Sequence, residues 1–452
     1  MGSFIPNTDN DRRQMLDFLG KSSIEDFFLR IPESVRVKNL NLQSGLSEVE
    51  LSRKITSLAQ ENKVFPVIFR GAGAYRHYIP AAVKRIISNE TFLTAYTPYQ
   101  AEISQGILQG IFEYQTMICE LTGMDVSNAS VYDGASAAAE AVNMCAGSFA
   151  ASSAGNSVRR NVYVSKAAHP HTIETIKTYC FGSGASVTLV PVTNEGKTDL
   201  EALEKMLGED KSACCLYLQN PNFFGLIEDA KTAAKIIHDS GALFIEGVNP
   251  MSLGLLESPG DCGADIAVGE GQSLGLPLAF GGPYLGFMAC KSALMRKMPG
   301  RIVGETVDSK GQRAFVLTLQ AREQHIRREK ALSNICSNEA LCALTAAVYL
   351  SVMGCEGFAE VSRQNHSKAV YASSRINEIP GFSLVYKGDF FNEFVSCCPD
   401  CEKTLKFLEE KNILGGYTVA KNRILWCVTE ANTKEEIDTL AELLRTFSKE
   451  HL

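Results

Sequence analysis

The sequence predicts an α/β protein built on a mainly parallel sheet. Between about residues 90 and 320, short apolar runs alternate with amphipathic helical patterns. Strands that are separated by helices of about ten residues form βαβ units, and the resulting parallel sheet is covered on both faces. The chain has 452 residues, which is enough for roughly two or three domains with buried cores.

The first part of the chain, residues 1–90, is predicted to form an N-terminal helical arm. Thr8 can accept a hydrogen bond at the start of a first helix, and Gly20 suits the end of that helix. Further helices are expected over 23–29 and 47–60. The βαβ pattern begins only after this arm.

Residues 91–330 are predicted to form a large α/β domain with a seven-stranded sheet. The apolar runs expected as strands are 129–132, 161–164, 186–191, 214–218, 242–245, 266–268 and 284–289. Residues 331–452 are predicted to form a smaller C-terminal α/β domain. Its last helix opens with a capping box, formed by Thr433 and Glu436.

Composition and charge argue against several classes of function. The net charge is −7 and Lys and Arg form no dense cluster, so nucleic-acid binding is not expected. The longest mostly apolar run, 340–355, is too short to span a bilayer, and no membrane association is expected. The 14 cysteines have no framework spacing and the N-terminus shows no signal peptide, which together indicate a cytoplasmic protein.

A turn of Gly134, Ala135 and Ser136 follows the expected strand at 129–132 and opens an alanine-rich helix. Backbone N–H groups at the start of such a helix can bind a phosphate, with the Ser136 hydroxyl as a further donor. An ordinary N-cap by Asp133 or Ser136 explains the same residues. Taken alone, the turn favours the ordinary cap.

Gln272 lies shortly after the expected strand at 266–268, in a glycine-rich turn. In enzymes that use pyridoxal phosphate, such a strand end usually carries a lysine, whose amine forms a Schiff base with the cofactor. A glutamine amide has no nucleophilic lone pair and cannot form this bond. Either the chain is not such an enzyme, or it is one half of one.

A second junction between a strand and a turn contains Glu246 and Asn249. Pyridoxal enzymes usually place an aspartate here, and its charge keeps the ring nitrogen of the cofactor protonated. Asn249 is neutral and cannot stabilise a pyridinium as an ion pair does. If Asn249 has this position, the pocket lacks a second of its working parts.

No metal site is expected. His169 and His171 form a His-x-His pair after a strand, but no Asp, Glu or Cys nearby completes a set of ligands. Helix capping, or a ring that lines a site, is the favoured role for these histidines. Cys398 and Cys401 form one CxxC without a second pair at ligand spacing.

Two further segments could border a site. Tyr96, Tyr99, Gln100 and Glu102 lie close together in a Pro-containing approach to a helix, and they could form the lip of a pocket. Arg322 lies in a densely charged run. That run is either a solvated helix face or a surface that contacts an anion or another subunit.

Several segments carry longer motifs. They lie at 73–80, 94–106, 112–117, 298–304 and 322–330. Together they resemble the glycine-cleavage P-protein family, glycine decarboxylase, over essentially the whole chain. The length matches the alpha chain of the two-chain form of this family, which corresponds to the N-terminal half of the single-chain form.

The resemblance implies the pyridoxal-enzyme fold of the aspartate-aminotransferase type, fold type I. It also implies a glycine dehydrogenase (aminomethyl-transferring, decarboxylating) that is active only as a complex of this chain with subunit 2, the beta chain. Pyridoxal phosphate would be bound covalently by a lysine of subunit 2 and not by this chain. Glycine would lose CO2, and its aminomethyl group would pass to the lipoylated H-protein. The implied assembly is a heterotetramer of alpha and beta chains, two of each.

The resemblance also implies roles for single residues. Comparison of the two halves of the family at shared Pro and Gly-Gly-Pro landmarks places the lysine of subunit 2 at Gln272, its ring aspartate at Asn249 and a histidine of its site at His169. No catalytic residue is therefore expected in this chain. A degenerate cofactor pocket would be formed by Gly134, Ser136, His169, Asn249 and Gln272. A wall of the shared site would be formed by Tyr96, Tyr99, Gln100, Glu102 and Arg322.

Two other functions stay open. The chain could be an independent pyridoxal-phosphate enzyme that uses another lysine, of which Lys291 is the nearest along the sequence. It could also be a non-catalytic scaffold or regulatory subunit, because fold alone does not fix function.

Overall fold

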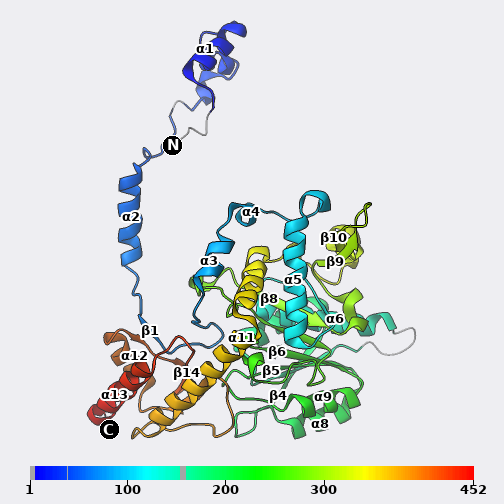
Figure 1. Cartoon of the computed structure of the whole chain (residues 1–452), viewed down its shortest axis with the longest axis vertical. Helices are drawn as coiled ribbons and strands as arrows, with labels where there is room; N and C mark the ends of the chain where they lie inside the picture. Colours follow the sequence, from blue (N-terminus) through cyan, green and yellow to red (C-terminus); the bar gives the residue numbers. More distant parts are fainter. Residues whose placement is uncertain (1–5, 38, 153–158, 452) are drawn as a thin grey trace. The chain divides into compact units, whose positions relative to one another are not determined.

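The computed structural model of the chain describes residues 6–37, 39–152 and 159–451. It contains two compact units, of which the first ends at Val64 and the second begins at Phe65 (Figure 1). The α-helices of the first unit are α1 (Asp9–Phe18) and α2 (Glu48–Gln60), and two short 3-10 helices, Ile24–Phe28 and Glu33–Val35, lie between them in sequence. Thr8 and Ser47 cap α1 and α2, each through a capping box. The division of the chain into three parts at residues 90 and 330 stays a prediction.

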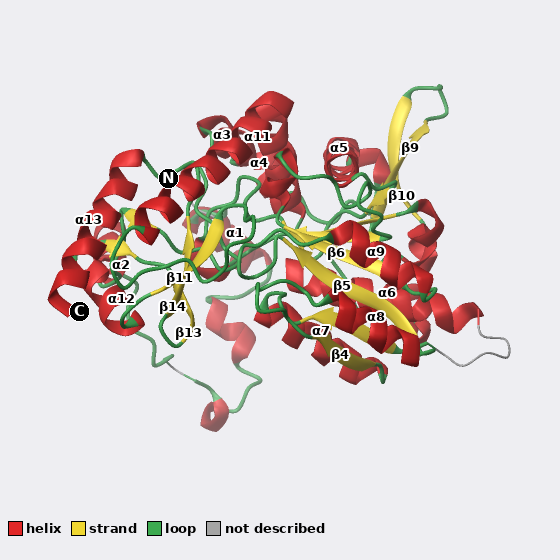
Figure 2. Ribbon diagram, turned by 90° about the horizontal axis from the view of Figure 1, so that it is seen from below, coloured by secondary structure: helices red, strands yellow, loops and turns green. Residues whose placement is uncertain are grey.

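The second unit is built around a seven-stranded sheet, which confirms the predicted α/β class with a mainly parallel sheet (Figure 2). The strands lie in the order β2, β8, β7, β6, β5, β3, β4. The parallel core of the sheet consists of β3 (Asn161–Ser165), β4 (Ser186–Val190), β5 (Ala213–Asn220), β6 (Leu243–Val248) and β7 (Ile266–Glu270). β8 (Gly286–Cys290) runs antiparallel to β7 and to the edge strand β2 (Val126–Ser127).

The first predicted strand, 129–132, is wrong. The edge position belongs to β2, and only Val131 forms an isolated bridge, with Gly286. Ser130 has a φ of 110°, which is far from the extended values of a strand. The apolar run therefore bends at Ser130 instead of pairing along its length. Each of the later predicted strands is present.

Helices cover both faces of this sheet. One face packs against α6 (Gly134–Ser152) and α7 (Pro170–Ser183). The other packs against α5 (Gln105–Thr122), α8 (Leu200–Glu209), α9 (Ala230–Asp239) and the first half of α11 (Ala340–Asn377). The alternation along β6 shows this division, because Phe244 belongs to the core of one face and the next residue, Ile245, to the core of the other.

α11 is a 38-residue helix with a bend at Gly354, whose φ is 60°. Within the described parts of the chain it is the one helix that is long and apolar enough to cross a membrane, judged by length and composition alone. Its residues Ala343, Ala346 and Tyr349 are buried in the core of the large sheet. This core position explains the apolar composition.

A smaller antiparallel sheet lies toward the C-terminus. Its order is β11 (Glu393–Cys397), β14 (Arg423–Cys427) and β13 (Tyr417–Ala420). α12 (Cys401–Glu410), α13 (Lys434–His451) and the second half of α11 share a core with it, in which Trp426 is fully buried. The other elements are the helices α3 (Ala81–Ile87), α4 (Glu90–Leu93) and α10 (Gln324–Arg327), the pair β9 (Ile302–Val307) and β10 (Arg313–Thr318), and the pair β1 (Val67–Ile68) and β12 (Ile413–Leu414).

Residues 65–80 form an extended strap that binds to the small sheet and borders the large one. Near its start, β1 pairs in parallel with β12, and the N–H of Phe69 donates to the carbonyl of Leu414 at 2.8 Å. Near its end, Oγ1 of Thr429 donates to the carbonyl of Arg76 at 2.6 Å. The strap is therefore held on both sides of its middle segment, 72–75.

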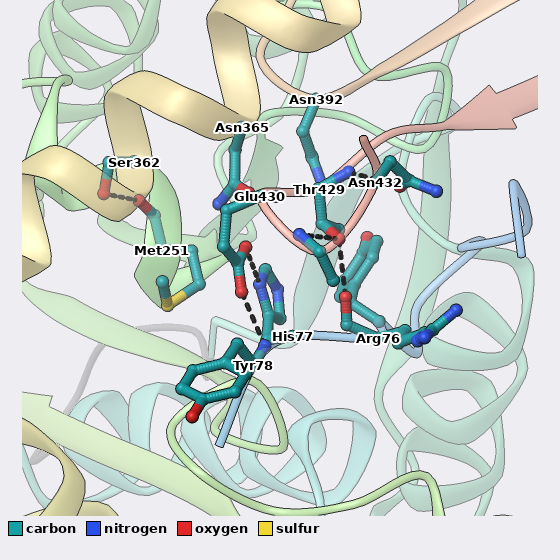
Figure 3. A network of polar contacts seen from close by, with 12 residues as sticks. Arg76, His77, Tyr78, Met251, Ser362, Asn365, Asn392, Thr429, Glu430 and Asn432 are labelled. Carbon is teal, nitrogen blue, oxygen red and sulfur yellow. Dashed lines mark hydrogen bonds and ion pairs between the residues drawn. The ribbon is translucent and has the colours of Figure 1, made fainter. Parts of the chain in front are cut away.

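Glu430 binds the last part of the strap (Figure 3). Its carboxylate accepts hydrogen bonds from Nδ1 of His77 at 2.8 Å and from the N–H of Tyr78 at 2.6 Å. Its own N–H donates to Oδ1 of Asn365 on α11 at 2.6 Å. Burial alone would raise the pKa of Glu430, but the hydrogen bond and charge of His77 and the N–H of Tyr78 hold that pKa below its ordinary value. The ionised carboxylate therefore stabilises the fold.

Glu430→Gln is expected to lower the free energy of unfolding at neutral pH by about 1–3 kcal/mol, because an amide weakens a buried contact to an ionised acceptor. A pKa that is depressed on folding stabilises the fold above the unfolded pKa, here near 4.5, and this contribution is lost as the pH falls through the folded pKa. The difference between wild type and variant should therefore shrink below pH 4.5. Urea unfolding over a pH series measures it.

The control for this experiment is Glu356→Gln, which changes an exposed glutamate on α11. It should shift stability by less than about 0.5 kcal/mol at any pH. A Glu430→Gln effect that is the same at every pH would contradict the role of the ionised carboxylate.

Candidate functional site

A cavity of about 290 Å³ lies at the carboxyl edge of the parallel strands. This is the edge at which open parallel sheets usually bind ligands. The strap, the start of α6 and the ends of β5, β6 and β7 surround it. Of the residues predicted to form a degenerate pocket, Gly134, His169 and Asn249 line the cavity, and Gln272 is bonded to the lining residue Tyr75.

Gln272 clamps the strap through its side-chain amide. Oε1 accepts a hydrogen bond from the N–H of Tyr75 at 2.9 Å, and Nε2 donates to the carbonyl of Tyr75 at 3.0 Å. The second N–H of the amide donates to the carbonyl of Leu276 at 2.8 Å. Because the side chain is only 1% exposed, these bonds satisfy donors that water cannot reach. The residue at the predicted lysine position thus has a structural task.

Two more side chains hold the strap at the cavity. Glu393 accepts from the N–H of Ala72 at 2.7 Å and from the hydroxyl of Tyr75 at 2.8 Å, and burial raises its pKa to about 7. Nε2 of His169 lies 2.9 Å from the carbonyl of Ala72, and Nδ1 lies 3.1 Å from the N–H of His171. One ring nitrogen donates and the other accepts, so His169 is neutral, and burial lowers its pKa.

Asn249 and Glu246 differ in their relation to the cavity. Asn249 lines the cavity, and its Oδ1 accepts from the N–H of Met251 at 3.1 Å, so it caps the short turn that follows β6. Glu246 does not line the cavity. Its Oε1 accepts from Nδ2 of Asn220 at 3.1 Å, and burial raises its pKa to about 7. Of the two residues offered for the ring aspartate, only the neutral Asn249 faces the cavity.

The start of α6 is capped by its own chain. The N–H of Ser136 donates to Oδ1 of Asp133 at 2.8 Å, and the N–H of Ala137 donates to the carbonyl of Asp133 at 2.9 Å. Gly134 donates its N–H to Oε2 of Glu270 at 2.9 Å. The ordinary cap by Asp133, which the sequence favoured over a phosphate seat, is the arrangement in the structure. Ser136 itself does not line the cavity.

The predicted wall lies away from this cavity. Tyr96 and Tyr99 are 87% and 56% exposed, and Gln100 and Glu102 are also exposed. The hydroxyl of Tyr99 accepts a 2.9 Å hydrogen bond from Nη2 of Arg301, whose guanidinium carbon lies 5.2 Å from the centre of the Tyr99 ring. These wall residues do not line the cavity of this chain, and their side chains stay accessible to another molecule.

Arg322, the fifth predicted wall residue, is partly buried and bound to its own chain. Nε donates to the carbonyl of Leu319 and Nη2 to the carbonyl of Gly300, both at 3.0 Å. Burial lowers its pKa. Nη1 has no hydrogen-bond partner among the described residues. The side chain therefore supports the local fold, and its unpaired nitrogen is buried.

Sequence analysis missed four polar residues that the structure makes important: Tyr75, Glu270, Glu393 and Arg301. Glu270 ends an apolar strand two residues before Gln272, and Glu393 opens another apolar strand. In both cases an acidic residue within an apolar run was the available signal in the sequence. Such a residue is expected to be buried, and a buried carboxyl group requires hydrogen-bond partners. Tyr75 and Arg301 lie in the motifs of the family resemblance and gave no separate signal.

The residues around the cavity do not fit a Schiff base made by this chain. No lysine is among the described residues that line it. Lys291 lies at the opposite edge, because its N–H donates at 3.0 Å to the carbonyl of Asp265, the residue just before β7. Its Nζ lies 2.9 Å from Oδ1 of Asp265. The cavity adjoins the other end of β7, so Lys291 cannot serve it.

In the described parts of the chain, no group of three or more His, Cys, Asp or Glu side chains is placed to bind a metal ion. His169 uses both ring nitrogens on the backbone. The sulfurs of Cys398 and Cys401 lie 3.2 Å apart as free thiols.

Gln272→Ala is expected to loosen the strap, because the N–H and carbonyl of Tyr75 lose their partner together. The amide of Tyr75 should exchange with deuterium about tenfold faster, and the free energy of unfolding should fall by about 1–3 kcal/mol. Hydrogen exchange of peptides that cover 72–78 measures the first effect. The control is Gln109→Ala, which removes an exposed glutamine that bonds Glu113 on the same helix. Unchanged exchange in the strap would show that its other anchors suffice.

Comparisons with known proteins identify the family of the chain. A family model described as glycine cleavage system P-protein matches residues 2–444. A protein of Desulforamulus reducens, named probable glycine dehydrogenase (decarboxylating) subunit 1, is 50% identical over 456 residues, which cover 98% of this chain and 100% of that protein. A protein of the same name from Moorella thermoacetica is 50% identical over 452 residues, which cover 98% of this chain and 99% of that protein.

Solved structures agree with this result. The crystal structure of a glycine decarboxylase (P-protein) of the glycine cleavage system, in inhibitor-bound form, has a TM-score of 0.89 at 40% identity and covers 98% of this chain and 100% of that chain. Mouse CSAD in apo form has a TM-score of 0.68 at 16% identity, with 98% of this chain and 92% of that chain covered, and shares the fold alone. The fold is the pyridoxal-enzyme fold of the aspartate-aminotransferase type, fold type I, as predicted. With its full-length match and its sheet-edge cavity, the chain belongs to the glycine cleavage system P-protein family.

Proposed function

We propose that the chain is subunit 1 of a two-chain glycine dehydrogenase (aminomethyl-transferring, decarboxylating) and that it is active only in complex with a lysine-bearing subunit 2. One observation carries this proposal. The amide of Gln272 is bound on the backbone of Tyr75 and Leu276, so this strand end offers no amine for a Schiff base. Relatives that share about half of its residues along the whole length bear the name of that subunit.

In the proposed complex, glycine is decarboxylated and its aminomethyl group passes to the lipoyl arm of the H-protein. Pyridoxal phosphate is bound covalently by subunit 2 and supplies the electron sink for this chemistry. The present chain contributes no group to that bond. The assembly we propose is a cytoplasmic heterotetramer of alpha and beta chains, two of each.

The part of this chain that would reach the active site of the partner is the exposed wall. Tyr96 and Tyr99 present large aromatic surfaces, of the kind enriched in the centres of protein interfaces. Arg301, which is only 4% exposed, fixes Tyr99 through a hydrogen bond and a cation–π contact. A wall that is ordered before binding loses less conformational entropy when the partner docks.

The alternative functions have less support. An independent pyridoxal enzyme would need a lysine at the cavity, and the structure places Lys291 at the opposite edge of the sheet. A non-catalytic scaffold would take no part in a reaction, whereas the full-length relatives are named as a subunit of an enzyme.

Glycine–bicarbonate exchange tests the proposal, with H-protein and pyridoxal phosphate present throughout. The chain alone should show no exchange, and its addition to subunit 2 should raise the rate well above that of subunit 2 alone. Borohydride reduction of the active complex, followed by peptide mass mapping, should place the reduced cofactor on a lysine of subunit 2. A pair no more active than subunit 2 alone, or a cofactor trapped on this chain, would overturn the proposal.

Tyr96→Ala should lower the exchange rate of the pair by about tenfold at limiting subunit concentrations, because loss of a central aromatic contact weakens an interface by a kcal/mol or more. The melting temperature of the chain should not change, since Tyr96 is 87% exposed. Phe181→Ala is the matched control, because Phe181 is 90% exposed on α7 and lies outside the predicted wall. Equal activity of the Tyr96→Ala pair and the wild-type pair would remove Tyr96 from the wall.

A further inference from the structure

Glu270 places a carboxyl group of the chain itself at the start of α6. It is the last residue of β7, and its Oε2 accepts the N–H of Gly134 at 2.9 Å. Its Oε1 accepts the N–H of Gln272 at 3.0 Å and that of Leu285 at 2.9 Å. Both oxygens therefore accept backbone hydrogen bonds, as the oxygens of a bound phosphate do at other helix N-termini.

The approach of Glu270 to the helix is close. A Cβ atom added to Gly134 would lie 2.8 Å from the backbone nitrogen of Glu270 and 2.9 Å from its Cβ. Because real side chains do not tolerate such contacts, the glycine is what lets β7 end against the first turn of the helix. Glycine in phosphate-binding turns serves a similar close approach, but here the neighbour is the chain itself.

Two other backbone donors of this turn also have partners. Asp133 accepts the N–H of Ser136 with its side chain and the N–H of Ala137 with its carbonyl. Among the described residues that line the cavity there is no lysine or arginine, and His169 is neutral. A phosphate ester brought to this helix would find the N–H groups of Gly134, Ser136 and Ala137 occupied. It would find no cation to pair with, and the carboxyl groups of Asp133 and Glu270 would lie beside it.

The protonation state of Glu270 does not alter this conclusion. Burial raises its pKa, three backbone N–H groups lower it, and the nearby Asp133 raises it again, so that the pKa lies above its ordinary value. A protonated carboxyl still accepts the N–H of Gly134 and still fills the same space. What differs is only the strength of the repulsion that an anion meets.

We propose that Glu270 is an internal substitute for a phosphate group at the start of α6, and that this residue makes the cavity of this chain reject phosphorylated ligands. The proposal goes beyond the proposed function, because it concerns the chain's own cavity and holds whether or not a second subunit performs the chemistry. It also implies that a lysine at position 272 would not by itself restore a cofactor site.

Binding of pyridoxine phosphate and pyridoxine to the full chain tests this directly, because neither ligand has an aldehyde and both bind without a lysine. Isothermal titration calorimetry should show no preference of the wild-type chain for the phosphate ester. Glu270→Leu, which removes the carboxyl and retains an apolar side chain, should bind pyridoxine phosphate about tenfold more tightly than pyridoxine, since the N–H of Gly134 becomes available to an anion. Glu270→Ala serves in its place if the leucine variant melts early.

Glu257→Leu is the matched control, because it removes an exposed carboxylate that pairs with Lys231 outside the cavity lining. It should behave like the wild type. A wild-type chain that already prefers pyridoxine phosphate by about tenfold, or folded Glu270 variants that gain no such preference, would overturn the proposal. Either result would leave the exchange test of the subunit pair unaffected, so the two proposals can fail separately.

Discussion

The pairing between the side chain of Gln272 and the backbone of Tyr75 is the constraint on which the cavity depends. One amide satisfies both the N–H and the carbonyl of the same residue, at 2.9 and 3.0 Å. A lysine could donate to the carbonyl, but it has no acceptor for the N–H, which would then be buried without a partner. This position can therefore hold a strap or a Schiff base, and the choice of one excludes the other. The middle of the strap is fixed to the large sheet by this clamp and to β11 by Glu393.

Four polar residues around the cavity share one property: they bind the backbone of their own chain. Gln272 binds Tyr75, Asn249 binds the N–H of Met251, and Glu270 binds the N–H of Gly134. His169 binds the backbone with both ring nitrogens. In a cofactor enzyme these positions would direct their polar atoms at a ligand. Here these side chains form hydrogen bonds within the protein instead.

The sheet could be predicted from the local pattern of apolar residues. The candidate site could be predicted only in part, because its contacts join residues that are far apart in sequence. Apolar runs separated by helices identified β3 to β8, because burial on both faces selects such runs directly. The run at 129–132 had the same composition, but the positive φ of Ser130 bends it, and composition does not report a single backbone angle. Gln272 and Asn249 were found because their positions follow strand ends. The contacts of Tyr75 were not found, because Tyr75 lies 197 residues from Gln272 and 318 residues from Glu393 in sequence. No local period encodes such a contact.

The cavity and the exposed wall of this chain differ in whether their side chains are already bound within the protein. At the cavity, Gln272, Glu270 and His169 form hydrogen bonds with the backbone of the chain, so a ligand that uses these side chains would have to displace an existing bond. At the wall, Tyr96 and Tyr99 are 87% and 56% exposed. Exposed apolar side chains gain free energy when a partner covers them, and no internal contact has to be broken first. We therefore expect this chain to bind its partner through its exposed surface. The residues at the cavity act as a fixed internal support for the strap.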